Sequence, residues 1–363
     1  MTDLVNLGIG EPDFSPPKHV TEAAILALNE GKTHYSPSNG IPELREAIAE
    51  KYSREYRVSY APDNEILVTV GATEAVAIAL MALVNPGDDV LLPDPGFVCY
   101  KPAVLLAGGN PVPIPMKLKD GFKPDFETVT SLITDRSRVI IINSPNNPTG
   151  SVMTYDELKT LGKIAVENDL IVISDEVYEK ITYDQTKHYC FATFPDQRER
   201  TIVVNSFSKT YAMTGLRVGY ALGPKELISS MTLAQQFVVA SVNSPAQYAA
   251  TAALEGDQKF IANMVSEFDI RRRLICNGLN ETKGFRCNLP EGAFYVFPNI
   301  EDFETKSLDF SQFLAKEARV VTTPGSAFGR QGEGFLRLSY STSSENINEA
   351  LHRIEQATQK LRI

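Results

Sequence analysis

Several groups that bind anions or move protons stand directly after short apolar runs of the sequence. They supply an amine, a carboxylate, a phenol, a carboxamide, hydroxyls and the first amides of a helix. In chain order they belong to Ala72, Thr73, Asn147, Asp175, Tyr178, Ser206, Ser208 and Lys209. A lysine accompanied by acidic and hydrogen-bonding groups is typical of nucleophilic and acid–base catalysis.

The apolar runs are predicted strands. They span residues 66–70, 89–92, 138–143, 170–174 and 201–205. Each is nearly continuous in apolar content, which is typical of strands buried on both faces of a mainly parallel sheet. Helices are predicted between them, for example at 72–84 and at 155–168. Because ligands bind at the carboxyl ends of strands in such sheets, the polar groups are expected to converge in one crevice.

The C-terminal part has a different pattern. A long charged helix is predicted at 257–282, strands at 293–297 and 335–340, and an amphipathic helix from Ser344. The expected fold class is α/β, in which a large domain has a mainly parallel sheet sandwiched by helices. A smaller α+β domain is expected from the N- and C-terminal segments. The predicted bounds are 36–272 for the large domain, and 1–35 with 273–363 for the small one.

The composition narrows the class of protein. Of the 363 residues, 43% are hydrophobic and 22% are charged, as is usual for a soluble globular protein. The net charge of −10 argues against a nucleic-acid partner, which favours a basic surface. We expect no secretory signal and no membrane span, because no apolar run is long enough. The 4 cysteines lack CxxC spacing, so neither disulfides nor a metal site are expected and a cytoplasmic enzyme is predicted.

A phosphate group would find several partners in the predicted crevice. Ala72 and Thr73 open a helix, whose first backbone N–H groups favour anions. Ser206 and Ser208 add hydroxyl donors, and Arg217 adds a guanidinium group. These residues therefore predict a phosphorylated ligand.

The remaining groups match the other atoms of pyridoxal 5′-phosphate (PLP). Asp175 suits the ring nitrogen, because a buried carboxylate keeps a pyridinium protonated. Asn147 and Tyr178 can donate to the phenolate oxygen of the ring. Lys209 can form the Schiff base and then serve as the proton shuttle. The sequence thus predicts PLP as the cofactor.

Six motifs, in order along the chain, resemble the signature set of the class I/II (fold type I) PLP-dependent aminotransferases. The general pattern is similar to the prokaryotic aspartate and aromatic aminotransferases. The motifs are GIGEPDF at 8–14, YSPSNGIPELREAIA at 35–49, Asn147-Pro-Thr-Gly, Asp175-x-x-Tyr178, SFSKTYAMTGLRVGY at 206–220 and FLRLSYS at 335–341. One such motif is weak evidence, whereas six in series indicate the family.

The resemblance implies further roles. Phe97 would lie on the pyridine ring, although many relatives have Tyr or Trp there. Arg337 would bind the substrate α-carboxylate through its two-pronged guanidinium, and Gly10 would line the same pocket. Tyr35 would reach the phosphate of the partner subunit, which implies a homodimer with sites at the interface.

The predicted reaction is a ping-pong transamination. The α-amino group of an amino acid would pass to a 2-oxo acid, with 2-oxoglutarate as the expected acceptor. Two other PLP reactions use the same motifs, namely C–S β-elimination and cyclopropane-carboxylate synthesis. A PLP-binding sensor module of a transcription regulator is a remote alternative, because it would need a DNA-binding domain before Gly10. A dinucleotide-binding dehydrogenase is disfavoured, since no GxGxxG follows a strand.

The preferred amino donor stays open at this level. A dicarboxylate such as aspartate needs a second cation or polar cluster, and the sequence indicates none. Phe14 and residues 241–243 are candidate pocket residues that carry no positive charge. An aromatic or apolar donor is therefore as compatible with the sequence as aspartate.

Overall fold

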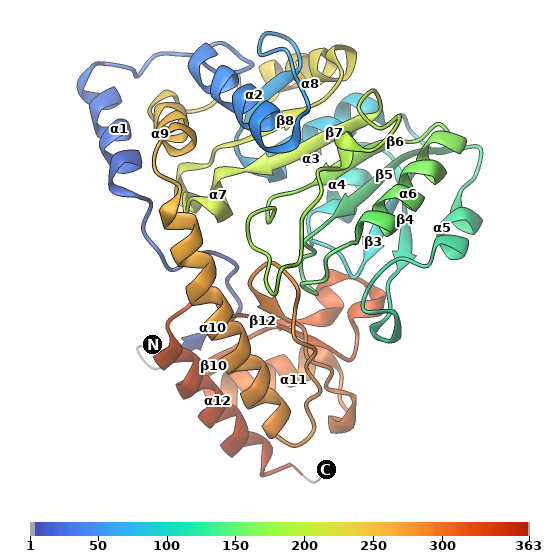
Figure 1. Cartoon of the computed structure of the whole chain (residues 1–363). Coiled ribbons are helices and arrows are strands. Elements are labelled where there is room, and N and C mark those ends of the chain that lie inside the picture. Colours follow the sequence, from blue (N-terminus) through green and yellow to red (C-terminus); the bar gives the residue numbers. More distant parts are fainter. Residues whose placement is uncertain (1–3, 362–363) are drawn as a thin grey trace.

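The computed structural model describes residues 4–361, which form a large part built on one sheet and a smaller part beside it (Figure 1). The large part contains most of the chain's middle. The smaller part brings the N-terminal strand together with the C-terminal segment. Helix α10 (Lys259–Glu281) runs from the first part into the second.

A seven-stranded sheet forms the centre of the large part. Its strands lie in the order β2-β8-β7-β6-β5-β3-β4. Their bounds are β2 (Ile66–Thr69), β3 (Asp89–Asp94), β4 (Asn110–Pro115), β5 (Ser137–Asn143), β6 (Ile171–Asp175), β7 (Thr201–Ser206) and β8 (Gly219–Leu222). Only β8 runs antiparallel to its neighbours, so the other six strands present their carboxyl ends at one edge.

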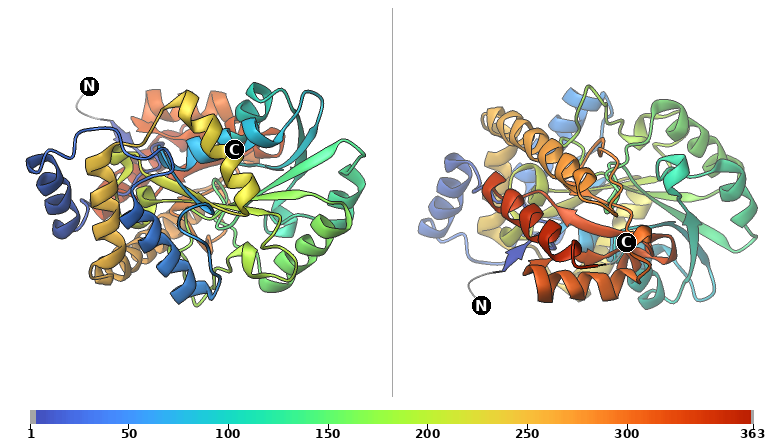
Figure 2. Two further views of the ribbon diagram at one scale, coloured as in Figure 1. Left: turned by 90° about the horizontal axis from the view of Figure 1, so that it is seen from above. Right: turned by 90° about the horizontal axis from the view of Figure 1, so that it is seen from below.

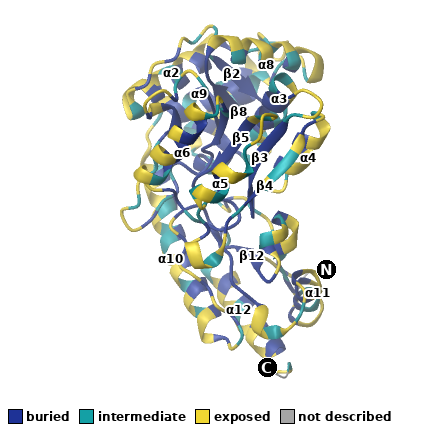
Figure 3. Ribbon diagram, turned by 90° about the vertical axis from the view of Figure 1, so that its right-hand side faces the viewer, coloured by how far each residue is buried: buried dark blue, intermediate teal, exposed yellow. Residues whose placement is uncertain are grey.

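Helices cover both faces of this sheet, and the strands are accordingly buried (Figure 3). The side chains of β5 point alternately to the two faces of the sheet. Val139 and Ile141 pack in one core, and Ile140 and Ile142 pack in another. One face carries α3 (Gly71–Leu83), α4 (Tyr100–Leu106) and α8 (Lys225–Val238); the other carries α2 (Pro42–Tyr56), α5 (Phe126–Leu132), α6 (Tyr155–Glu167) and α9 (Ser244–Glu255). Figure 2 shows the two layers from above and below.

The smaller part has its own core. Strand β1 (Val5–Asn6) pairs in parallel with β10 (Val320–Val321), which joins the N-terminal segment to the C-terminal one. A second sheet has the order β11-β12-β9, made of β9 (Tyr295–Val296), β11 (Thr323–Pro324) and β12 (Leu336–Ser339). The helices here are α11 (Ser307–Phe313), a π-helical turn at Leu314–Ala318, and α12 (Ser344–Thr358), which packs on α10.

Five predicted strands of the large sheet are confirmed to within two residues at each end. The helix predicted at 155–168 is also confirmed as α6, and its cap Thr154 forms a capping box with Glu157. Strands β4 and β8 were not predicted, and the strand expected at 293–297 is only two residues long. Within residues 4–361, no helix combines the length and apolar content that a membrane crossing requires.

The predicted domain bounds stay a prediction. Helix α1 (Lys18–Asn29) packs on α9, and its Val20 belongs to a core of the large part. Val5 and Leu7 lie instead in the core of the smaller part. The segment at 4–35 therefore contacts both parts.

Candidate active site

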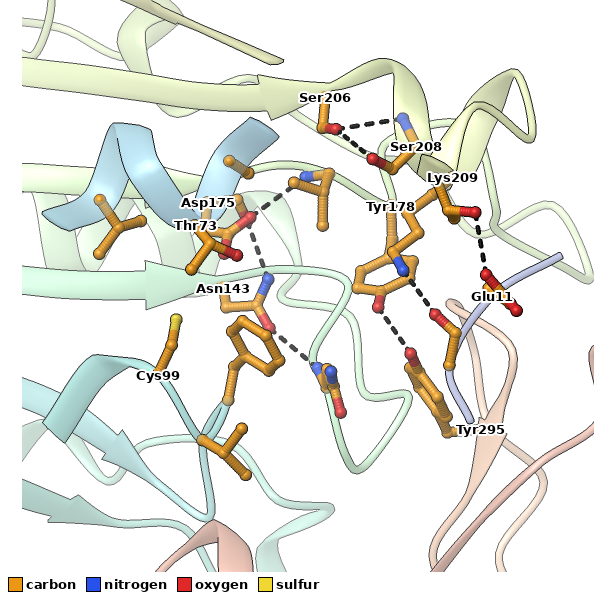
Figure 4. Close-up of a pocket in the computed structure, with 18 of the residues that line it drawn as sticks. Glu11, Thr73, Cys99, Asn143, Asp175, Tyr178, Ser206, Ser208, Lys209 and Tyr295 are labelled. Atoms are coloured by element: carbon orange, nitrogen blue, oxygen red, sulfur yellow. Dashed lines mark hydrogen bonds between the residues drawn. The ribbon is translucent and has the colours of Figure 1, made fainter. Parts of the chain in front are cut away.

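A cavity of about 370 Å³ opens at the carboxyl edge of the large sheet, where the smaller part meets it (Figure 4). Twelve of the thirteen predicted site residues line it. They are Gly10, Ala72, Thr73, Phe97, Asn147, Asp175, Tyr178, Ser206, Ser208, Lys209, Arg217 and Arg337. The convergence expected from the strand ends is thus what the structure has, while each residue's role stays a prediction.

Lys209 lies in the one-turn helix α7 (Phe207–Thr210), directly after β7. Its Nζ donates a hydrogen bond to the carbonyl oxygen of Gly10 at 2.5 Å. Burial lowers the pKa of Lys209 to about 8, and the nearby positive charge of Arg337 acts in the same direction. Roughly a tenth of this amine is therefore unprotonated, and nucleophilic, at pH 7.

Asp175 ends β6 and is buried. The phenol of Tyr100 donates to its Oδ2 at 2.6 Å, and the backbone N–H of Val177 donates to its Oδ1 at 3.3 Å. Burial nevertheless raises the pKa of Asp175 to about 6, because these two donors offset only part of the lost hydration. A cationic group placed beside this carboxylate would be strongly favoured.

Anion-binding groups gather at the start of α3. A Cβ atom at Gly71 would come within 2.8 Å of Nη2 of Arg217, and one at Gly219 within 2.6 Å of the Gly71 backbone. Only glycine at both positions allows Arg217 and β8 to approach the helix N-terminus so closely. The hydroxyl of Ser206 donates to that of Ser208 at 2.9 Å on the same side of the cavity.

Arg337, on β12, faces the same cavity from the smaller part. Its Nη1 donates to Oδ1 of Asn147 at 3.1 Å, and its Nη2 donates to the carbonyl oxygen of Gly8 at 2.6 Å. The guanidinium lies against the rings of Tyr295 and Phe328, at 4.5 and 4.9 Å from their centroids. Its Nε is buried and has no hydrogen-bond partner within residues 4–361, so a donor remains available for an anionic ligand.

Two aromatic contacts complete the walls. The hydroxyls of Tyr178 and Tyr295 are hydrogen-bonded at 2.9 Å, and both groups are buried. Phe97 is half-buried, with its ring edge-on to Tyr100 at 5.8 Å. Phe97 can therefore offer an apolar face to a planar ligand.

Three sequence candidates do not contribute to this cavity within one chain. Tyr35 is 89% exposed and does not line it. Neither Phe14 nor residues 241–243 are among the described residues of the lining. Phe14 instead packs edge-on against Phe268, and its candidacy as a pocket residue stays a prediction.

Four lining residues were not predicted, namely Glu11, Asn143, Tyr295 and Phe328. Tyr100 was not predicted either; it does not line the cavity but donates to Asp175. Tyr100 and Tyr295 read as ordinary core aromatics in the sequence, and only their hydrogen bonds to predicted residues reveal them. Asn143 had a usable signal, because it is the polar last residue of a predicted strand; it donates to the carbonyl oxygen of Asp175 at 3.0 Å. Glu11 and Phe328 belong to segments that meet the cavity only through tertiary packing.

The residues present fit PLP. A helix N-terminus, two hydroxyls and a guanidinium suit its phosphate. The buried carboxylate of Asp175, whose pKa is raised in a cavity that offers it too few donors, suits a protonated ring nitrogen. The amine of Lys209, with its lowered pKa, suits the aldehyde.

Comparisons with known proteins agree with this geometry. The chain matches the family profile described as aminotransferase class I and II over residues 2–354. It is 45% identical to the aspartate aminotransferase of Pyrococcus abyssi, in an alignment covering 100% of this chain and 94% of that protein. It is 42% identical to aromatic-amino-acid aminotransferase 2 of Thermococcus litoralis, over 99% of this chain and 93% of that one.

A solved structure is equally similar. The aromatic aminotransferase from Pyrococcus horikoshii superimposes with a TM-score of 0.96 at 45% sequence identity. The match covers 99% of this chain and 97% of that structure. The similarity therefore extends over both parts of the molecule.

Proposed function

The chain belongs to the aminotransferase class I and II family, and from this premise we propose that its cavity binds PLP through the residues named above. It is an enzyme, an aminotransferase, of a family that depends on PLP. The observation that carries the proposal is the convergence of Lys209, Asp175 and Arg217 on one cavity with the N-terminus of α3. The amino donor would bind through its carboxylate to Arg337.

Different residues of the cavity would bind different parts of PLP. Arg217, Ser206 and Ser208 would hold the phosphate together with the first N–H groups of α3. Asp175 would keep the ring nitrogen protonated, with Tyr100 orienting its carboxylate. Asn147 and Tyr178 would donate to the phenolate oxygen of the ring, and Phe97 would lie on one face of the ring. Thr73 and Ala72 supply part of the wall at the helix start.

When bound, PLP supplies an aldehyde carbon that accepts the amino group and a ring that stores the released electron pair. The protein's own part is to orient and to move a proton. Arg337 would fix the substrate carboxylate so that its α-carbon faces Lys209. The Nζ of Lys209 would take the proton from that carbon and later return it, which its pKa of about 8 allows near neutral pH. Donor and 2-oxo acid, expected to be 2-oxoglutarate, would use the site in turn.

The donor is proposed to be an aromatic or apolar amino acid, or aspartate. Within residues 4–361 the cations of the lining are Lys209, Arg217 and Arg337, each with a proposed partner. A second carboxylate would therefore depend on a group from outside this lining. Relatives of comparable identity bear the names of aspartate and of aromatic aminotransferases, which supports testing both donors.

The test is spectroscopic and chemical. The purified protein should absorb in the visible range, and an accepted amino donor should remove that absorption in the absence of a 2-oxo acid. A panel of twenty amino donors with 2-oxoglutarate should then identify the substrate through glutamate formation. A colourless protein that binds no added PLP would contradict the proposal. Release of pyruvate and ammonia from cystathionine, without an acceptor, would indicate a β-lyase instead.

We also infer a homodimer to which Tyr35 contributes across the interface. Tyr35 follows α1, whose Ile25, Leu26 and Leu28 side chains are all more than half exposed. Apolar groups that a single chain leaves in water favour burial by a second copy. Sedimentation should give twice the chain mass, and Tyr35→Phe should weaken PLP binding without dissociating the dimer. A cytoplasmic location belongs to the same proposal and can be tested by cell fractionation.

A further inference from the structure

The segment at 175–179, which begins at the last residue of β6 and forms the turn that follows it, has two faces with different partners. Asp175 and Tyr178 line the cavity (Figure 4). Glu176 and Glu179 are buried too, but the cavity lining does not include them. Two acidic side chains thus lie behind the two groups that are proposed to contact the cofactor.

Glu179 is held by helix α2. Its Oε1 accepts a hydrogen bond from the Nζ of Lys51, and its Oε2 accepts one from the phenol of Tyr56. Lys51 also donates to the hydroxyl of Tyr220 at 3.2 Å. The Lys51 and Glu179 side chains are only 3% and 2% exposed, so this ion pair is fully removed from water.

Both members of the pair are charged. Burial alone would raise the pKa of Glu179, but the ammonium group of Lys51 lowers it to about 2. Burial alone would lower the pKa of Lys51, but the Glu179 carboxylate raises it well above its ordinary value. Lys51 also lies 4.7 Å from the ring centroid of Tyr52, which favours the cation.

Glu176 is anchored from another direction. Its Oε1 accepts hydrogen bonds from Ser174 Oγ at 2.8 Å and from the backbone N–H of Phe191 at 2.9 Å. Its Oε2 lies 3.0 Å from Nε2 of His188. The outer face of the turn is therefore tied both to α2 and to the segment at 188–191.

We propose that Lys51 and Glu179 are positioning residues whose buried ion pair fixes the 175–179 turn against α2 and thereby sets where Asp175 and Tyr178 lie in the cavity. This inference rests on the proposed function. A buried ion pair adds little net stability over apolar residues of similar size, so stability by itself does not explain it. Its directional hydrogen bonds instead allow one arrangement of the turn, whereas apolar contacts tolerate small shifts.

The test compares three variants of the full-length holoenzyme. Glu179→Gln leaves Lys51 buried without a carboxylate. Lys51→Met/Glu179→Gln removes both charges, so that neither is left unpaired. Asp89→Asn is the matched control: this buried carboxylate accepts from Asn110 and Thr134 at the opposite end of the sheet. The readouts are Tm, affinity for PLP measured by fluorescence titration, and the pH at which the visible absorption changes.

Glu179→Gln should lower Tm and bind PLP about tenfold more weakly. The pH at which the visible absorption changes should rise, because Tyr178 is displaced as a hydrogen-bond donor. The double variant should recover part of the Tm but not the PLP affinity. Asp89→Asn should lower Tm and leave both cofactor readouts unchanged.

A recovery of PLP affinity in parallel with Tm in the double variant would overturn the inference, because the pair would then act through stability alone. Wild-type affinity and spectrum in Glu179→Gln would overturn it as well. If Glu179→Gln does not fold, the double variant and the control still decide between these outcomes. A wild-type protein without a visible absorption band would instead contradict the proposed function. Of the three readouts, only Tm would then differ between the variants.

Discussion

Two clusters of buried charge lie on opposite faces of the 175–179 turn, and they differ in how their charges are balanced. On the cavity face, burial raises the pKa of Asp175 to about 6 and lowers that of Lys209 to about 8. On the outer face, the Lys51–Glu179 pair lowers the pKa of Glu179 to about 2 and raises that of Lys51. The first cluster shifts toward neutral forms, and the second is held in its charged forms.

This difference indicates where bound ligands are expected to stabilise the charges of the protein. In the Lys51–Glu179 pair each charge has its opposite within hydrogen-bond distance, so the fold alone satisfies it. In the cavity the carboxylate and the amine have only neutral hydrogen-bond partners among the described residues, and Arg337 keeps an unpaired N–H. A charge that the protein leaves uncompensated is available to a cofactor and a substrate.

The largest effect should follow from Lys209→Ala. Since Lys209 is proposed both to hold PLP and to move the proton, kcat should fall by about 10³-fold or more, and the visible band should be lost. Stopped-flow and absorption measurements on the purified variant check this. A Lys209→Ala protein that kept the wild-type spectrum would remove the lysine from the mechanism.

Lys51→Met should produce the next largest effect, on stability rather than on chemistry. Removing one partner of a buried ion pair leaves the other charge unpaired, which costs about 3–5 kcal/mol. Urea unfolding of the cofactor-free protein measures this loss. Lys209→Met is the matched control and should not destabilise that form, because the wild-type amine there hydrogen-bonds to a neutral carbonyl rather than to a carboxylate. Equal losses for both lysines would erase the contrast between the clusters.

Asp175→Asn should stabilise the cofactor-free protein while impairing PLP binding. The folded pKa of Asp175, about 6, lies above the ordinary value, so its contribution to stability is present in acid and is lost as the pH rises through 6. At pH 8 the variant should therefore be more stable than wild type by about 1–3 kcal/mol, and near pH 4 the difference should vanish.

Glu179→Gln should change the stability in the opposite direction. Its folded pKa of about 2 lies below the ordinary value, so its contribution is present above that value and is lost as the pH falls through 2. This variant should be less stable than wild type at pH 8. Unfolding curves of both variants between pH 2 and 8 check the pair. The stability difference from wild type should change between about pH 4 and 6 for Asp175→Asn and between about pH 2 and 4.5 for Glu179→Gln. Changes of the same sign with rising pH would contradict the assignment of the two clusters.

The smallest effect is expected for Tyr295→Phe. The variant loses the hydrogen bond between the hydroxyls of Tyr178 and Tyr295, which contributes about 0.5–1.5 kcal/mol. PLP affinity or kcat/KM should fall by a few-fold. Tyr183→Phe removes a comparable buried hydrogen bond to the carbonyl oxygen of Ala293, away from the cavity, and should leave both quantities unchanged.

The sequence predicted the central strands because they are continuous apolar runs, but it missed β4 and β8. Strand β4 contains prolines at 111, 113 and 115, which read as a loop; the strand lies at the edge of the sheet, where proline is tolerated. Strand β8 is four residues long and follows the arginine motif directly. Neither sequence pattern could be distinguished from that of a loop without knowing which strands lie beside it.

The sequence by itself determined which chemical groups are available, because a lysine, a carboxylate and an arginine at strand ends are fixed by residue type and spacing. Tertiary structure decided their charge balance. Tyr100 reaches Asp175 across 75 positions, and Lys51 reaches Glu179 across 128. Both partners come from helices whose packing no local pattern specifies, and a pKa depends on the hydration and the charges within a few ångströms. The same turn therefore carries reactive groups on one face and compensated ones on the other.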